Sequence, residues 1–143
     1  MPTTTTAQLT NEGVIDQQAH MLTGSSSPTL FISLFTNNLT KDSTLTFADF
    51  TFPADTGSQP QNYSSGITLS STSAVGATSW NSVFFSWIFT GTPSESYAGY
   101  VVYNTTGDIS WWMDTFASPV SNNGSIGGIM VQSSGDFGQI DAS

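Results

Sequence analysis

Charged side chains are scarce in this chain of 143 residues, and basic ones are almost missing. Charged residues make up 8% of the sequence, against about 25% in ordinary soluble domains. Lys41 is the only lysine or arginine, and the formal net charge is -9. Because proteins contact phosphates chiefly with lysine and arginine, this composition argues against nucleic-acid binding and against basic docking on anionic lipid. Lys41 also offers trypsin its only cleavage position.

Cysteine and long apolar runs are missing as well. Without cysteine the chain has no disulfide and no thiolate metal site. The longest apolar run, VFFSWIF at residues 83–89, is far shorter than the roughly 20 residues that a membrane helix needs. Residues 1–10 have neither the basic nor the apolar region of a cleaved signal peptide. We therefore expect a soluble protein with no membrane partner.

Histidine is nearly missing too, which weakens the case for catalysis. A Ser-His-Asp triad would have to use His20, and Asp16 lies four residues earlier on the same predicted helix face. Asp108 and Asp114 lie about 20 Å apart along one predicted strand, whereas glycosidase carboxylates are separated by roughly 5–9.5 Å. A carboxylate pair formed across two strands stays open. We expect a protein that is not an enzyme.

The loops offer a weak alternative of calcium binding. Asp108, Asp136 and Asp141 lie in segments rich in carbonyl groups and turn-forming residues, and calcium prefers oxygen ligands. The same residue types are ordinary turn formers, and no EF-hand spacing is present. We therefore expect no metal and no cofactor.

What the chain has in quantity is short apolar segments separated by turn residues, which predicts a mainly β protein. We expect an antiparallel β-sandwich of the jelly-roll or immunoglobulin-like kind. One short helix is predicted over about 12–22, capped by Asn11, with a polar arm at 1–10 before it and a single domain over 11–143. The helix has one apolar stripe, formed by Val14, Ile15, Ala19 and Leu22. Strands are predicted at 29–36, 45–52, 67–72, 82–90, 96–104, 109–116 and 126–132.

Several of these strands have apolar side chains on both faces. Neighbouring residues of a strand point to opposite faces, so Trp111 and Trp112 are not expected to enter one core. A two-layer sandwich leaves the outer face of each sheet uncovered. The helix can cover part of that area, and we expect another subunit to cover the rest. The predicted partner interface consists of Phe84, Ile88, Trp111 and Trp112, in a homo-oligomer.

Two stretches carry a resemblance to a known family. LFISLFTNNLTKDSTLTFADFTFP, at residues 30–53, and YAGYVVYNTTGDISWWMDTFASPV, at residues 97–120, resemble the two signature stretches of a family of small phage virion structural proteins. The resemblance spans most of residues 12–120 and includes the predicted helix. Its motifs are packing signatures and bring no catalytic residue with them. The resemblance implies a structural component of the virion.

Resemblance and surface chemistry together favour a capsid decoration (cement) protein, which stabilises the shell by bridging capsid subunits. The expected partners are the major capsid protein and copies of the chain itself, and the expected location is the virion. The alternative is a carbohydrate- or receptor-binding module of a tail or head fibre. In that alternative Trp80, Trp87, Trp111 or Trp112 would stack on sugars.

Overall fold

The structure is a computed structural model, and it describes residues 7–24, 28–63, 67–71, 78–82 and 84–132. It has one α-helix, α1, among these residues, and two 3-10 turns. The elements are, in chain order, β1 (Gln8–Leu9), α1 (Asn11–Thr23), β2 (Leu30–Phe35), η1 (Phe47–Asp49), η2 (Thr56–Ser58), β3 (Gln61–Asn62), β4 (Ile67–Ser71), β5 (Thr78–Ser82), β6 (Phe84–Phe89), β7 (Ser96–Asn104), β8 (Ile109–Ser121) and β9 (Gly127–Gln132).

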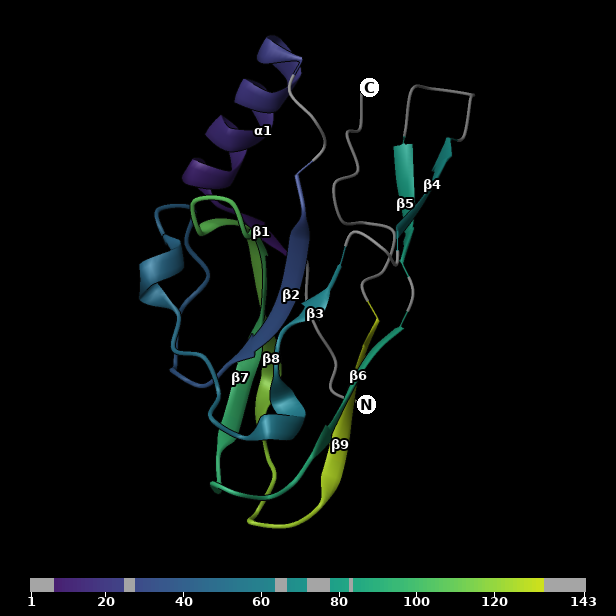
Figure 1. Ribbon diagram of the computed structural model, residues 1–143. Helices are drawn as coiled ribbons and strands as arrows, with labels where there is room; N and C mark the ends of the chain where they lie inside the picture. The colour runs from purple at the N-terminus through teal and green to yellow at the C-terminus, as the bar shows by residue number, and fades with distance from the viewer. Residues whose placement is uncertain (1–6, 25–27, 64–66, 72–77, 83, 133–143) are drawn as a thin grey trace.

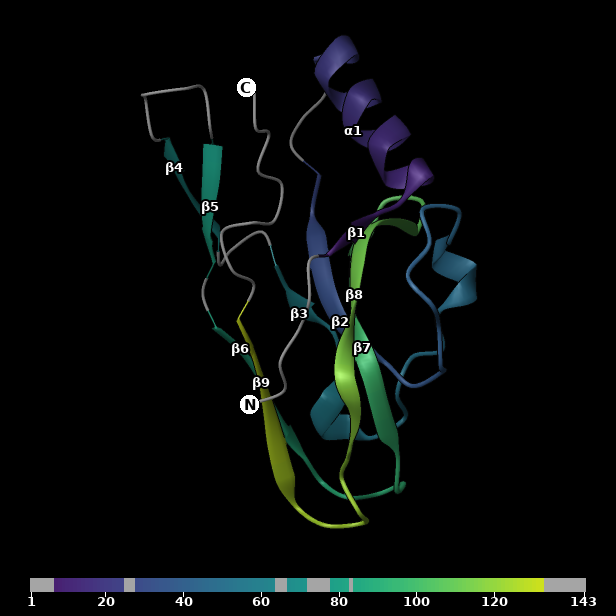
Figure 2. The same ribbon diagram turned by 180° about the vertical axis from the view of Figure 1, so that it is seen from behind.

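The strands form antiparallel sheets, which confirms the predicted mainly β, sandwich-like fold. A five-stranded sheet has the order β1-β8-β7-β2-β3, while β6 pairs with β9 and β4 pairs with β5. Figures 1 and 2 show the β6–β9 pair facing the five-stranded sheet, with α1 at the opposite end of the molecule from the β8–β9 connection. The molecule is therefore elongated along its strands.

The main core lies between the five-stranded sheet and the β6–β9 pair. Trp87 and Val131 contribute to it from one side and Ile32 from the other, and each is at most 2% exposed. Two stacked ring pairs join the layers, with centroids 5.1 Å apart for Tyr63 and Phe85 and 4.5 Å apart for Phe89 and Tyr97. The side chains that β6 contributes to this core follow from its alternation, because residues 85, 87 and 89 share one face of the strand.

The outer face of the five-stranded sheet is covered by the same chain. A second apolar cluster on that face combines Val101 and Met113, both fully buried, with side chains from residues 36–53, which we call the cover segment. Phe47 lies 4.9 Å from Tyr103 and Phe50 lies 5.2 Å from Phe35, between ring centroids. The two-faced strands therefore have an intramolecular cover, where we expected a second subunit.

The cover segment also corrects the strand predicted over 45–52. The segment forms the 3-10 turn η1 and irregular chain, because polar side chains bond the backbone groups that a strand would pair in a ladder. The Asp49 carboxylate accepts from the Thr46 N–H at 2.7 Å. The Asn37 side chain donates to the Asp49 carbonyl at 2.7 Å and accepts from the Thr51 N–H at 2.9 Å.

A β-bulge brings the adjacent tryptophans into one core, against the alternation that the sequence suggested. In the β7–β8 register Val102 pairs with Trp112 and Tyr103 pairs with Ser110, so Trp111 is an extra residue on β8. Both tryptophans belong to the main core cluster, with ring centroids 6.2 Å apart. The extra residue shifts the facing of the strand by one position, and two neighbours can then point to one side.

The end of the predicted arm is part of the five-stranded sheet. β1 pairs with β8, with Gln8 opposite Met113 and Leu9 opposite Trp112, and Thr10 is fully buried. Residues 8–10 of the predicted arm are therefore ordered within the chain itself, since the edge of β8 supplies their hydrogen-bonding groups. Residues 1–6 of the arm lie outside the described residues.

Shortening one apolar side chain of the cover segment tests whether the segment is part of the core. Phe50→Ala removes a ring that is 6% exposed, and we expect the free energy of unfolding to fall by about 3–5 kcal/mol. Leu22→Ala truncates a side chain that is 87% exposed, and its effect should stay within about 0.5 kcal/mol. Urea unfolding of both variants measures the difference. Equal stability of the two variants would contradict the covering role.

Candidate functional site

Asp16, the acidic partner expected for His20, fastens α1 to the β7–β8 hairpin. Its Oδ2 accepts hydrogen bonds from Trp111 Nε1 at 2.8 Å and from Asn104 Nδ2 at 2.9 Å. His20 Nε2 lies 3.7 Å from the other oxygen, Oδ1. The carboxylate that a triad would need is therefore occupied in holding the indole of Trp111, and the geometry offers a structural role for this pair.

The first turn of α1 is fastened to β8 by polar groups as well. One oxygen of Glu12 accepts from the Ser110 N–H at 2.7 Å, from the Ser110 hydroxyl at 2.6 Å and from the Phe47 N–H at 2.8 Å. The helix is capped by Thr10, where Asn11 was expected, and the Thr10 hydroxyl accepts from the Gly13 N–H at 3.0 Å. Gly13 allows the first turn of α1 to lie close to the backbone of β8, because a Cβ at this position would lie 2.6 Å from the Ser110 carbonyl oxygen.

The apolar side of α1 faces away from the protein. Ile15, Met21 and Leu22 are 66%, 82% and 87% exposed. Ala19 of the predicted stripe is exposed too, and only Val14 is half-buried. Amphipathic helices normally bury the apolar stripe and expose the polar one. In α1 the arrangement is reversed, because Glu12, Gly13 and Asp16 make the contacts with the sheet. The expectation that the apolar stripe of the helix covers part of the apolar strands is therefore wrong.

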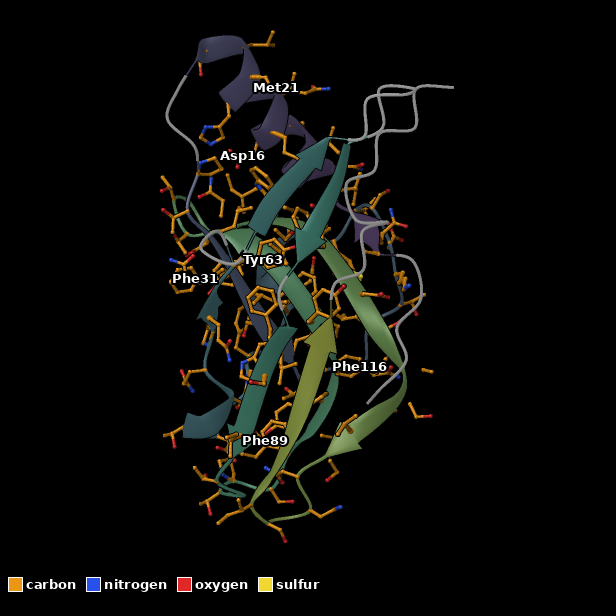
Figure 3. The ribbon with its side chains drawn as sticks, turned by 90° about the vertical axis from the view of Figure 1, so that its right-hand side faces the viewer. Asp16, Met21, Phe31, Tyr63, Phe89 and Phe116 are labelled. Carbon is orange, nitrogen blue, oxygen red and sulfur yellow. The ribbon has the colours of Figure 1, made fainter. Side chains whose placement is uncertain are left out.

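A second group of exposed apolar side chains lies at the other end of the molecule. Ile88 on the outer face of β6 is 72% exposed, and Ile126, in the β8–β9 connection, is 80% exposed. Figure 3 shows Met21 near one end of the molecule and Phe89, the neighbour of Ile88, near the other. Exposed apolar residues therefore lie at both ends of the long axis.

The four residues of the predicted interface differ in their exposure. Ile88 is exposed, whereas Trp111 and Trp112 are 7% and 4% exposed and covered within the chain. No subunit is needed to cover the second tryptophan, since α1 contacts Trp111 through Asp16 and the Tyr63 ring packs 5.4 Å from that of Trp112, between centroids. The side chain of Phe84 lies outside the described residues, as does that of Trp80. Trp87, 1% exposed, is also in the core.

The single basic residue forms an ion pair with a buried carboxylate. Lys41, in the cover segment, places Nζ 2.5 Å from Asp114 Oδ1 on β8, and the Asp114 side chain is 1% exposed. Burial, and then the charge of Asp114, raises the pKa of the Tyr100 phenol above its ordinary value. Tyr100 is the residue opposite Asp114 in the β7–β8 register. The pair therefore links the cover segment to the centre of the sheet.

A fully buried carboxylate, Asp55, joins three connections near the end that carries Ile88. It accepts from the N–H groups of Gly57, Thr90 and Gly91 at 2.8, 3.0 and 2.8 Å, from the Thr90 hydroxyl at 2.9 Å, and from Asn122 Nδ2 at 3.3 Å. We call these five residues the Asp55 junction. Desolvation by burial raises the Asp55 pKa, but the hydrogen bonds from Thr90, Gly57 and Gly91 outweigh it and lower the pKa from 3.8 to about 2.

Two structural features bear on metal binding and on membrane crossing. Within the ranges that the structure describes, no three histidine, cysteine, aspartate or glutamate side chains gather where a metal ion could be held. Asp136 and Asp141, named for calcium, fall outside those ranges, and Asp108 lies in the β7–β8 turn with a positive φ of 51°. Over the same described residues, α1 is too short and too polar to cross a membrane.

Comparisons of the chain with protein-family models, with curated proteins and with solved structures find no match. The candidate functional surface is therefore defined by geometry alone. It consists of the exposed apolar residues of α1 at one end and of Ile88 and Ile126 at the other. Sequence spacing identified the stripe on α1 and the outward position of Ile88. The outward orientation of the apolar stripe on α1 depends on Gly13, Glu12 and Asp16, which make the contacts with the sheet.

The Asp55 junction should contribute a defined part of the acid sensitivity. Because the folded-state pKa is lowered, the stabilisation by ionised Asp55 is present above 3.8 and is lost as the pH falls toward about 2. Asp55→Asn should lower the free energy of unfolding at neutral pH, and its stability curve should converge with that of wild type over that acid range. Urea unfolding at a series of pH values measures both curves. Parallel curves would contradict the assignment.

Proposed function

We propose that this protein is a non-enzymatic virion structural protein, a capsid decoration (cement) protein that stabilises the shell by bridging capsid subunits. The observation that carries the proposal is the presence of exposed apolar side chains at both ends of an elongated molecule, in addition to Leu9 on β1, which is 42% exposed. Single exposed apolar residues are common, but a helix that turns its apolar stripe outward needs a further explanation. A partner surface that covers the stripe is the simplest one.

The construction of α1 supports a binding role. Its first two turns are held by Glu12 and Asp16, which accept five hydrogen bonds from other elements. Its last turns, with Met21 and Leu22, extend away from the sheet (Figure 1). A helix fastened at one end and apolar at the other presents a fixed surface to a neighbour. We assign the major capsid protein as that neighbour.

The second exposed group makes bridging possible. A decoration protein that holds two neighbours together needs contacts at two separated places. Ile126 lies in the β8–β9 connection, at the far end from α1, and Ile88 is the neighbour of Phe89 near that end (Figures 1 and 3). The second contact is made to another capsid subunit or to another copy of this chain in a homo-oligomer. The resemblance of residues 30–53 and 97–120 to small phage virion proteins supports the same assignment.

Charge gives the interaction a further property. The only lysine or arginine of the chain is paired with a buried carboxylate, so it does not steer association. Burial of apolar surface depends weakly on ionic strength, whereas long-range attraction between charges is screened by salt. Attraction through a basic residue of this chain therefore contributes nothing that moderate salt would screen, and only the carboxylates can add a dependence on salt.

Polar substitutions on the outer side of α1 should weaken binding and leave the fold unchanged. Ile15→Gln with Leu22→Gln removes two exposed apolar side chains and keeps good helix formers. We expect at least a tenfold loss of affinity for particles that lack the protein, measured by co-sedimentation. The matched control Gln18→Ala changes an exposed polar residue of the same helix, and its affinity should stay at the wild-type level. Equal affinities for the double variant and the control would contradict docking through α1.

Removal of the whole protein distinguishes shell stabilisation from receptor binding. Particles that lack it should lose infectivity and expose their genome at a lower temperature than complete particles, while they adsorb to cells at the normal rate. Infectivity after heating, dye access to the genome and an adsorption assay measure these three properties. Particles with unchanged heat tolerance that no longer adsorb would replace the proposal with a carbohydrate- or receptor-binding function.

A further inference from the structure

The pairing of Lys41 with Asp114 has a chemical consequence beyond the proposed function. The two residues come from the cover segment and from β8, and they place an amine nitrogen 2.5 Å from a carboxylate oxygen. Ordinary charge-assisted hydrogen bonds of this kind measure about 2.7–2.9 Å. The chain has a single lysine, and its amine lies against the Asp114 side chain, which is 1% exposed.

Both reacting groups are held in place by their surroundings. The Thr115 N–H donates to the same Asp114 oxygen, Oδ1, at 2.8 Å, and the ladder with β7 fixes the backbone of Asp114 opposite Tyr100. On the other side, Leu39 and Leu45 pack against the outer apolar cluster on either side of Lys41 in the chain. Two groups held together in this way have a far higher effective concentration toward each other than the same two groups free in solution.

The low exposure of the carboxylate favours chemistry that removes the two charges. The Asp114 carboxylate, 1% exposed, has given up nearly all of its hydration, whereas the Lys41 side chain is still 22% exposed. Tyr100, which is 2% exposed, belongs to the same surroundings, because the charge of Asp114 raises the pKa of its phenol in addition to burial. The carboxylate carbon that the amine would attack therefore belongs to a side chain that water hardly reaches.

We propose that Lys41 and Asp114 form an intramolecular isopeptide bond. The ammonium of Lys41 first gives one proton to the carboxylate of Asp114. The nitrogen lone pair then attacks Cγ, the new C–N bond forms and the C–OH bond breaks. One hydrogen of the amine leaves with that hydroxyl as a water molecule, and the other stays on the amide nitrogen. The ion pair and the amide are both neutral overall, and the condensation needs no oxidant and no other reactant.

The bond gives the cover segment a covalent attachment to the sheet that it covers. The segment has no ladder of its own and is held by side-chain packing and by scattered hydrogen bonds. With Lys41 joined to Asp114, the segment cannot leave the outer face of the sheet even when the packing opens transiently. Such attachment suits a protein without cysteine, in which no disulfide can do the same.

Mass spectrometry and digestion of the denatured full-length protein test the bond directly. Wild type should be lighter than its sequence predicts by the mass of one water molecule, while Lys41→Arg and Asp114→Ala should each have their full expected mass. Lysyl endopeptidase acts on free lysine side chains, so it should leave denatured wild type uncut and cut Asp114→Ala once. Tandem spectra of a chymotryptic digest should show one branched peptide that joins the two residues.

Both readouts are taken on unfolded chains, so a variant that fails to fold still serves as a control. A wild-type protein of full mass that is cut completely at Lys41 after denaturation overturns the proposal, and the pair is then an ordinary ion pair. Loss of water that maps to any other residues overturns it as well. Because no particle takes part in the experiment, its outcome is independent of the proposed role in the virion.

Discussion

The need to cover both faces of the central strands governs the architecture. β2 and β7 have apolar side chains on both sides, and neither face can be left to water at the centre of a sheet. The β6–β9 pair covers one face and the cover segment covers the other. Strand β8, which borders β7, is then covered at its outer edge by β1 and, at the bulge, by α1. A chain of this length thus builds two apolar layers around one sheet.

Acidic side chains hold these covers in place. Glu12 and Asp16 fasten α1, Asp55 joins three connections, and Asp114 receives the only lysine. In each case a carboxylate accepts hydrogen bonds from several donors of the protein, the arrangement that compensates for loss of hydration. The negative charge of the chain is therefore not only a surface property. Much of it serves as an acceptor for backbone and side-chain donors where the covers meet the sheet.

The sequence predicted the elements whose pattern is local. The helix over about 12–22 and the strands at 29–36, 82–90 and 126–132 agree with α1, β2, β6 and β9 to within a few residues. The strand predicted over 45–52 was wrong, because alternation of apolar residues in LTFADFTF matches a covering segment as well as it matches a strand. Strand β5 was missed, since its residues carry no alternation. The bulge at Trp111 depends on the register with β7, which no single strand encodes.

The candidate site was only partly predictable for the same reason. Ile88 follows from alternation along β6, and the apolar stripe of α1 follows from helical spacing. Burial of both tryptophans depends on contacts between distant residues, such as Asp16 with Trp111.

The hydrogen bonds of the Asp55 junction also affect the conformational entropy of the chain beside β6. Because Asp55 accepts five hydrogen bonds from the connections beside β6, the backbone next to Ile88 is ordered by folding itself, and a partner of the kind proposed would have little left to order there.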